Sequence, residues 1–75
     1  MESKSPNLVQ DELPNWIKET LEELFKQEEF LELSNFCKNV IQQYPDSPIV
    51  WNNLGHAYRQ LRKYAEATKA FSKLV

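Results

Sequence analysis

The stretch Trp-Asn-Asn-Leu-Gly-His-Ala-Tyr occupies residues 51–58 and predicts a helix that packs closely against another helix. Trp51, Leu54 and Tyr58 share one helical face, because residues three and four apart lie next to one another there. Gly55 is the only glycine in the chain. Since a glycine inside a helix costs about 1 kcal/mol relative to alanine, we expect it to allow the close approach of a second helix.

The residues that follow supply this second helix and complete a known pattern. Tyr64-Ala65-Glu66-Ala67 and Phe71 place a small and a large apolar residue on one face. The chain thereby resembles the tetratricopeptide repeat, a 34-residue helix–turn–helix unit with the pattern W-x2-L-G-x2-Y, then A-x3-F, then P. The residues at matching offsets are Trp51, Leu54, Gly55, Tyr58, Ala67 and Phe71. In this register the repeat begins at Pro48, and its closing proline would fall beyond Val75.

An offset of 34 residues relates residues 14–47 to this repeat and predicts a first, divergent copy of it. Ile17 corresponds to Trp51, Leu24 to Tyr58, Phe30 to Tyr64, Glu32 to Glu66, Leu33 to Ala67, Cys37 to Phe71 and Val40 to Leu74. Leu21 replaces the family glycine and Leu33 its alanine, so we expect the helices of the first hairpin to lie further apart.

These correspondences predict an all-α fold, an α-α superhelix of two antiparallel helical hairpins. From Pro14 to Tyr44 no proline or glycine interrupts the chain, but the apolar stripe changes phase after Leu24, which predicts a turn near Gln27–Glu29. The expected helices are 14–27, 30–44, 48–61 and 64–75, with Ser47 capping the third through its hydroxyl and Pro48 in its first turn. Residues 1–13 are interpreted as a flexible lead-in, 14–47 as the first repeat and 48–75 as an incomplete second one.

Length and composition narrow the class of protein. Seventy-five residues allow one small domain, and a single cysteine forms no internal disulfide. No stretch has the roughly 18 apolar residues of a membrane span, and the first 13 residues lack the apolar core of a signal peptide. We therefore expect no membrane association and, by elimination, a cytoplasmic protein.

The net charge of −2 conceals an asymmetry along the chain. Residues 14–47 carry three lysines against six glutamates and Asp46, whereas residues 48–75 carry five lysines and arginines against Glu66 alone. The charges of the two segments are therefore −4 and +4. Such ends favour either head-to-tail stacking or an acidic partner at the C-terminal end. The other interpretation is two solvated faces of a longer array.

Residues that carry chemistry are few, and most have a structural interpretation. His56 is the only histidine and has no second ligand at metal-binding spacing. Cys37 lies on an apolar stripe and is interpreted as a buried structural residue. The glutamates from Glu22 to Glu32 are interpreted as a solvated face, and most aromatic residues coincide with packing positions of the repeat. We therefore expect no enzymatic activity, no metal or other cofactor and no nucleic-acid partner.

The resemblance implies a binding groove, because the first helix of each repeat in the family lines a concave surface that holds a partner peptide. The matching positions are Asn15, Lys18, Glu19, Glu22 and Phe25 in the first repeat, and Ile49, Asn52, Asn53, His56, Arg59 and Gln60 in the second. Some members clamp a C-terminal carboxylate with five residues. Lys18 and Asn53 match two of these positions, but Glu22 stands where asparagine is required, which argues against such a clamp.

The sequence thus predicts a non-catalytic interaction or scaffold module that holds a peptide or protein segment in a concave helical groove, as a piece of a longer repeat protein. One alternative is a self-association module, in which a second copy covers Phe71 and Leu74 by stacking or swapping. The other is an accessory repeat segment of a larger enzyme.

Overall fold

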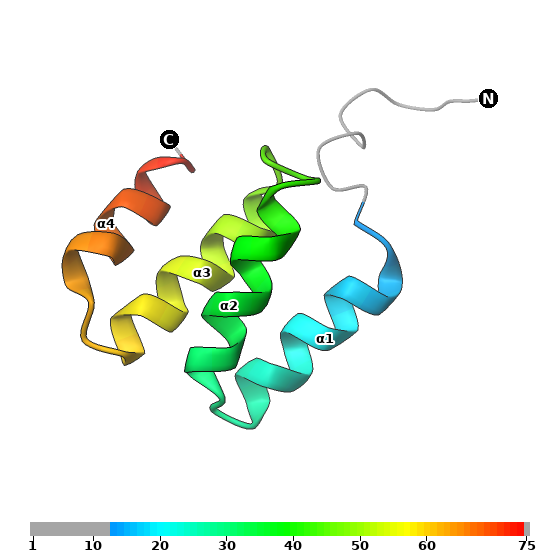
Figure 1. The fold of residues 1–75 in the computed structure, drawn as a ribbon, viewed down its shortest axis with the longest axis horizontal. Helices are drawn as coiled ribbons and strands as arrows, with labels where there is room; N and C mark the ends of the chain where they lie inside the picture. Colours follow the sequence, from blue (N-terminus) through cyan, green and yellow to red (C-terminus); the bar gives the residue numbers. More distant parts are fainter. Residues whose placement is uncertain (1–12, 75) are drawn as a thin grey trace.

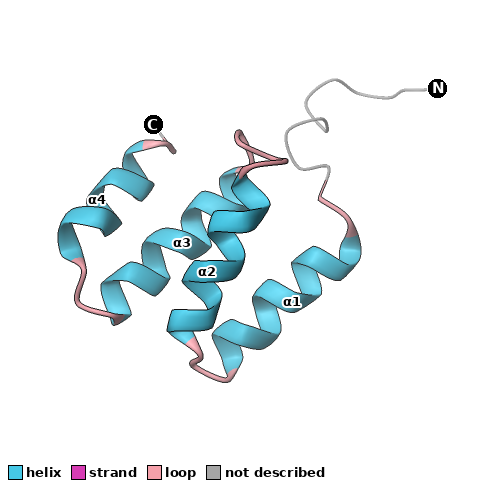
Figure 2. Ribbon diagram, in the orientation of Figure 1, coloured by secondary structure: helices cyan, strands magenta, loops and turns pink. Residues whose placement is uncertain are grey.

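The computed structural model describes residues 13–74, which form helices joined by short connections and contain no strand (Figure 2). The helices are α1 (Asn15–Lys26), α2 (Phe30–Ile41), α3 (Pro48–Gln60) and α4 (Tyr64–Ser72). The all-α class, the four helices and the turn after α1 are therefore as predicted. The predicted lead-in falls on residues outside the described part except for Leu13, which is buried in the core.

The four helices form two consecutive antiparallel hairpins, α1–α2 and α3–α4 (Figure 1). Helix α2 packs on α1 and on α3, and α3 also packs on α4. The turns inside the hairpins lie at one end of the molecule and the α2–α3 connection at the other. Helices α1 and α2 have far fewer close backbone approaches than α3 and α4, and they diverge away from their turn. This confirms the looser first hairpin predicted from Leu21 and Leu33.

Two helices end earlier than the sequence predicts. Helix α2 ends at Ile41 rather than Tyr44, and the backbone tightens there, with Gln43 N–H bonded to the Val40 carbonyl at 3.0 Å. Pro45 explains this, since the residue before a proline is disfavoured in helical conformation. Helix α4 ends at Ser72, where Leu74 N–H bonds to the Phe71 carbonyl at 2.9 Å. Val75, to which this helix was predicted to extend, lies outside the described residues.

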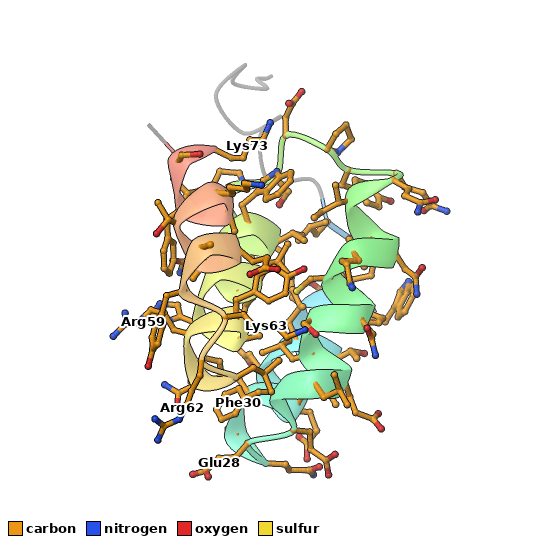
Figure 3. All side chains as sticks on the ribbon, turned by 60° about the vertical axis from the view of Figure 1, so that its left-hand side comes forward. Glu28, Phe30, Arg59, Arg62, Lys63 and Lys73 are labelled. Atoms are coloured by element: carbon orange, nitrogen blue, oxygen red, sulfur yellow. The ribbon has the colours of Figure 1, made fainter. Side chains whose placement is uncertain are left out.

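Both hairpin turns have the same hydrogen-bonded geometry at the end of the preceding helix. In the first, Glu28 N–H bonds to Phe25 O and Glu29 N–H to Leu24 O, each at 3.0 Å. In the second, Arg62 and Lys63 make the equivalent bonds to Arg59 O and Tyr58 O at 3.0 and 2.8 Å. This is a Schellman motif, which places one residue in the left-handed region. Here Glu28 (φ 60°) and Arg62 (φ 64°) occupy that position instead of glycine (Figure 3).

The hydrophobic core runs between the two hairpins. Its largest fully buried side chains are Leu21, Leu33, Cys37 and Val50, which come from α1, α2 and α3. Leu54, Ala57 and Ala70 extend this core toward α4. The predicted apolar stripes therefore face inward, and Cys37 is a core residue as expected, with burial raising the pKa of its thiol to about 12.

Gly55 lies directly against Phe71, which confirms the close helix contact predicted for it. A Cβ atom placed on Gly55 would meet three ring carbons of Phe71 at 2.5 to 2.7 Å, closer than such atoms pack. The corresponding positions of the first hairpin hold Leu21 and Cys37, both fully buried. The large residue is therefore on the first helix of one hairpin and on the second helix of the other.

Ser47 does not cap α3 as the sequence predicts. It precedes the helix in extended conformation, but its side chain makes no capping hydrogen bond. The side chain is buried, and Oγ has no hydrogen-bond partner. The capping prediction was therefore wrong, because the hydroxyl is buried without a bond to any backbone N–H of α3. Pro48 does occupy that turn as predicted.

The aromatic residues divide into packed and exposed ones. Trp51, Tyr58 and Phe71 are partly buried at the predicted packing positions, and Trp51 Nε1 donates to the Pro45 carbonyl at 2.6 Å. Trp16 and Tyr64, by contrast, are 61% and 60% exposed. These two rings are not core residues, although the Trp16 ring meets Phe36 of α2 edge to face with centroids 6.2 Å apart.

Candidate partner-binding groove

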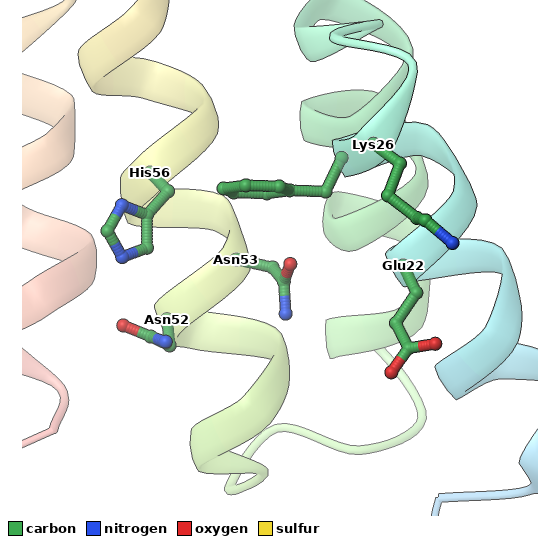
Figure 4. Close-up of a pocket in the computed structure, with 6 residues that line it drawn as sticks. Glu22, Lys26, Asn52, Asn53 and His56 are labelled. Carbon is green, nitrogen blue, oxygen red and sulfur yellow. The ribbon is translucent and has the colours of Figure 1, made fainter.

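An open hollow of about 520 Å³ lies between α1 and α3. Its wall on α1 consists of Glu22, Phe25 and Lys26, and its wall on α3 consists of Asn52, Asn53 and His56. Each set shares one helical face, since its members are one, three or four residues apart. Figure 4 shows Glu22 and Lys26 on α1 and Asn52, Asn53 and His56 on α3. We call this hollow the α1–α3 groove.

Aromatic rings form the apolar part of the groove. Phe25 is 41% exposed, and its ring meets the ring of His56 edge to face, with centroids 6.0 Å apart. Phe25 also contacts Phe30 at 5.8 Å, and His56 contacts Phe71 at 5.4 Å, again edge to face. The four rings form one row that crosses all four helices. Such pairs contribute about 0.5–1.5 kcal/mol each, so the row holds Phe25 and His56 in place.

The polar part of the groove combines two amides with two opposite charges. Asn53 Nδ2 donates to the Ile49 carbonyl of its own helix at 2.8 Å, which directs the amide and leaves Oδ1 as an acceptor for an external donor. Asn52 is exposed beside it. Glu22 and Lys26 line the hollow from α1 (Figure 4). The arrangement suits hydrogen bonds to a peptide backbone, which carries a donor and an acceptor at almost every residue.

The structure brings together four of the predicted groove residues, namely Glu22, Asn52, Asn53 and His56. Asn15, Lys18, Glu19 and Ile49 do not line this hollow, and Arg59 and Gln60 line a separate one at the end of α3. Phe25, which belonged to the wider predicted lining, is its aromatic centre. Lys26 was missed, although its position four residues after Glu22 places both on one face of α1.

The described residues hold no cluster of three or more His, Cys, Asp or Glu side chains that could bind a metal ion. Cys37 is fully buried, and a pKa of about 12 keeps its thiol protonated at neutral pH. It is therefore not placed to act as a nucleophile. None of the helices described is both long and apolar enough to cross a bilayer.

Comparison with known proteins identifies the repeat. The family model of the tetratricopeptide repeat matches residues 36–69. The match runs from the middle of α2 through α3 into α4 and includes the α1–α3 groove residues of α3 and Gly55, but not Phe71. Searches among curated proteins and among solved structures returned no match. The matched segment and the two antiparallel helical hairpins agree with the residue pattern around Trp51, and residues 36–69 form a tetratricopeptide repeat.

Proposed function

We propose that this chain is a non-catalytic interaction module that holds an extended peptide segment of a protein partner in the α1–α3 groove. Tetratricopeptide repeats generally serve as scaffolds for protein–protein interaction. The observation that carries the specific proposal is the combination of an exposed, oriented Phe25 ring with the amides of Asn52 and Asn53 in one open hollow. An apolar side chain of the peptide would pack on Phe25, while its backbone would bond to the amides.

A peptide-library screen with purified chain tests this assignment. Phe25→Ala and Asn53→Ala should each weaken the selected peptides by about threefold to tenfold, as expected for losing one packed ring contact or one hydrogen bond. Asn39→Ala is the matched control, because Asn39 is exposed on α2 and does not line the groove. Circular dichroism confirms that each variant remains folded. Unchanged affinities in both groove variants would show that the peptides bind elsewhere.

Self-association is a second candidate function, favoured by exposed apolar side chains at both ends of the row of helices. Trp16 lies on α1, whereas Tyr64 and Leu74, the latter 39% exposed, lie on or just after α4. The acidic charge of residues 14–47 and the basic charge of residues 48–75 favour a head-to-tail contact between copies.

Sedimentation velocity over a range of concentrations tests self-association. If copies stack, the sedimentation coefficient should rise with concentration and fall again at high salt, since salt screens the attraction between unlike ends. Trp16→Glu should abolish this rise while leaving the helical content unchanged. A chain that stays monomeric at the highest concentration would eliminate this candidate.

A further inference from the structure

The hollow at the turn between α3 and α4 differs in chemistry from the α1–α3 groove. It measures about 280 Å³ and is lined by Arg59, Gln60, Arg62 and Tyr64. Two guanidinium groups, an amide and a phenol thus surround it, and none of the residues lining it is acidic. Both arginines are exposed. We call it the arginine hollow.

The backbone of the turn holds the two arginines on one edge of the molecule. Arg59 lies in the last turn of α3, and the N–H of Arg62 bonds back to its carbonyl at 3.0 Å. Figure 3 shows both guanidinium groups projecting from this edge, whereas Lys63 extends in the opposite direction. The hydrogen-bonded turn therefore fixes the backbone positions from which both arginines project.

The fold itself does not require this pair. The first hairpin forms the same Schellman turn with Phe25 and Glu28 at the positions of Arg59 and Arg62. Neither arginine is needed to close such a turn, and the left-handed position at Arg62 favours glycine or asparagine on conformational grounds. The backbone conformation of the turn therefore does not explain why arginine occupies these two positions.

The segment that contains the arginine hollow, residues 48–75, carries five lysines and arginines and one acidic residue. Glu66, the only acidic residue in 48–75, lines a different hollow beside Tyr58 and Ala70. The pKa of Tyr58 is raised mainly by burial of its hydroxyl and, after that, by the negative charge of Glu66. The N-terminus of α4 has no side-chain cap, so its free N–H groups add partial positive charge near Tyr64. Guanidinium groups match the oxygens of carboxylates and phosphates through paired hydrogen bonds.

The arginine hollow continues the α1–α3 groove along α3. Arg59 follows His56 by three residues, a rise of about 4.5 Å along the helix. An extended peptide advances about 3.3 Å per residue, so a segment that leaves the groove reaches the arginines within about two residues. We propose that Arg59 and Arg62, aided by Gln60 and Tyr64, bind an oxyanion on the partner peptide, a carboxylate or a phosphorylated side chain. This inference rests on the proposed function of the groove.

Short peptides that differ at one position test the inference. Each contains phenylalanine and, two residues before or after it, phosphoserine, glutamate or serine. Binding is followed by NMR on the isotope-labelled chain, using backbone amides and arginine Nε–H signals. We expect the anionic peptides to bind about threefold to tenfold more tightly than the serine peptide. If the phosphoserine peptide binds more tightly than the glutamate peptide, the site prefers phosphate. If the two bind equally, the site accepts either a carboxylate or a phosphate.

Variants of the turn provide the control. Arg59→Gln and Arg62→Gln should each remove most of the anionic preference, whereas Lys63→Gln should preserve it, because that lysine points away from the hollow. If all three variants lost the preference for anionic peptides equally, general charge attraction would explain the effect and the proposed site would be wrong. Equal affinity of the three peptides for the unmodified chain would overturn it as well.

Inorganic phosphate separates failure of this site from failure of the groove. Phosphate that shifts the Arg59 and Arg62 signals, without any peptide shifting Phe25 or Asn53, supports the anion site and refutes the groove. Peptides that shift Phe25 and Asn53 equally whatever their charge, with no response to phosphate, support the groove and refute the anion site. Absence of both responses refutes both assignments.

Discussion

A single pair of residues, Gly55 and Phe71, sets how closely the second hairpin packs. The Phe71 ring occupies the space that a Cβ atom on Gly55 would need, and it also contacts the imidazole of His56 in the row of rings. In the first hairpin the equivalent pair is Leu21 and Cys37. Both combinations place one large and one small side chain at the same two positions, which conserves the volume of the contact.

Gly55→Leu should destabilise the fold by about 1–3 kcal/mol through overpacking, because the Phe71 ring must leave both Gly55 and His56. The midpoint of urea unfolding measures the loss. The double variant Gly55→Leu/Phe71→Cys places the residue pair of the first hairpin into the second. It should recover part of the lost stability, since the two sites are in contact. A double variant less stable than Gly55→Leu alone would contradict this account.

At the scale of elements, each helix end is decided by different local chemistry. Both hairpin turns close through Schellman hydrogen bonds despite charged residues at the left-handed position. The start of α3 instead depends on Pro48, because the preceding Ser47 is buried without a hydrogen bond. A buried polar group without a partner is unfavourable, so this connection contains a correctable defect.

Ser47→Ala should leave the free energy of unfolding unchanged or raise it by about 1 kcal/mol, because it removes an unpartnered buried hydroxyl and no hydrogen bond. If Ser47 capped α3 in solution, the same change would lower stability by about 1 kcal/mol. Thermal unfolding of the two proteins distinguishes these outcomes. Ser72→Ala is a suitable control, since that hydroxyl is exposed and bonds only within α4.

At the scale of the molecule, one core joins the hairpins, and Cys37 lies at its centre on α2. Burial raises the pKa of its thiol to about 12, well above the value of a free thiol. Between about pH 9 and pH 12 the unfolded chain therefore loses the thiol proton while the folded chain keeps it. Because the folded state then binds more protons, stability falls as pH rises through this range.

Urea unfolding at pH 8, 9 and 10 tests this linkage. Above pH 9, the free energy of unfolding of the unmodified chain should fall by up to about 1.4 kcal/mol more per pH unit than that of Cys37→Ala. The comparison with Cys37→Ala cancels the titration of tyrosines and lysines that both proteins share. Identical pH dependence in the two proteins would show that Cys37 is not buried in solution.

The sequence by itself determined the helical repeat, the hairpin boundaries and the close approach at Gly55. Helical periodicity and an offset of 34 residues are local properties of the chain, and they do not depend on how the helices finally pack. The resemblance to the tetratricopeptide repeat also pointed to four of the residues that line the α1–α3 groove, by their positions in the repeat.

Only the tertiary structure decided which polar residues lie together. The packing of α1 beside α3 brought Phe25 and Lys26 opposite Asn52, Asn53 and His56, and it excluded Asn15, Lys18 and Ile49. The turn after α3 separated Arg59 and Gln60 from the groove and joined them to Arg62 and Tyr64. Ser47 is buried and makes no capping hydrogen bond, although serine favours that position. Each of these depends on how much space neighbouring helices leave, and sequence spacing within one helix does not specify that distance.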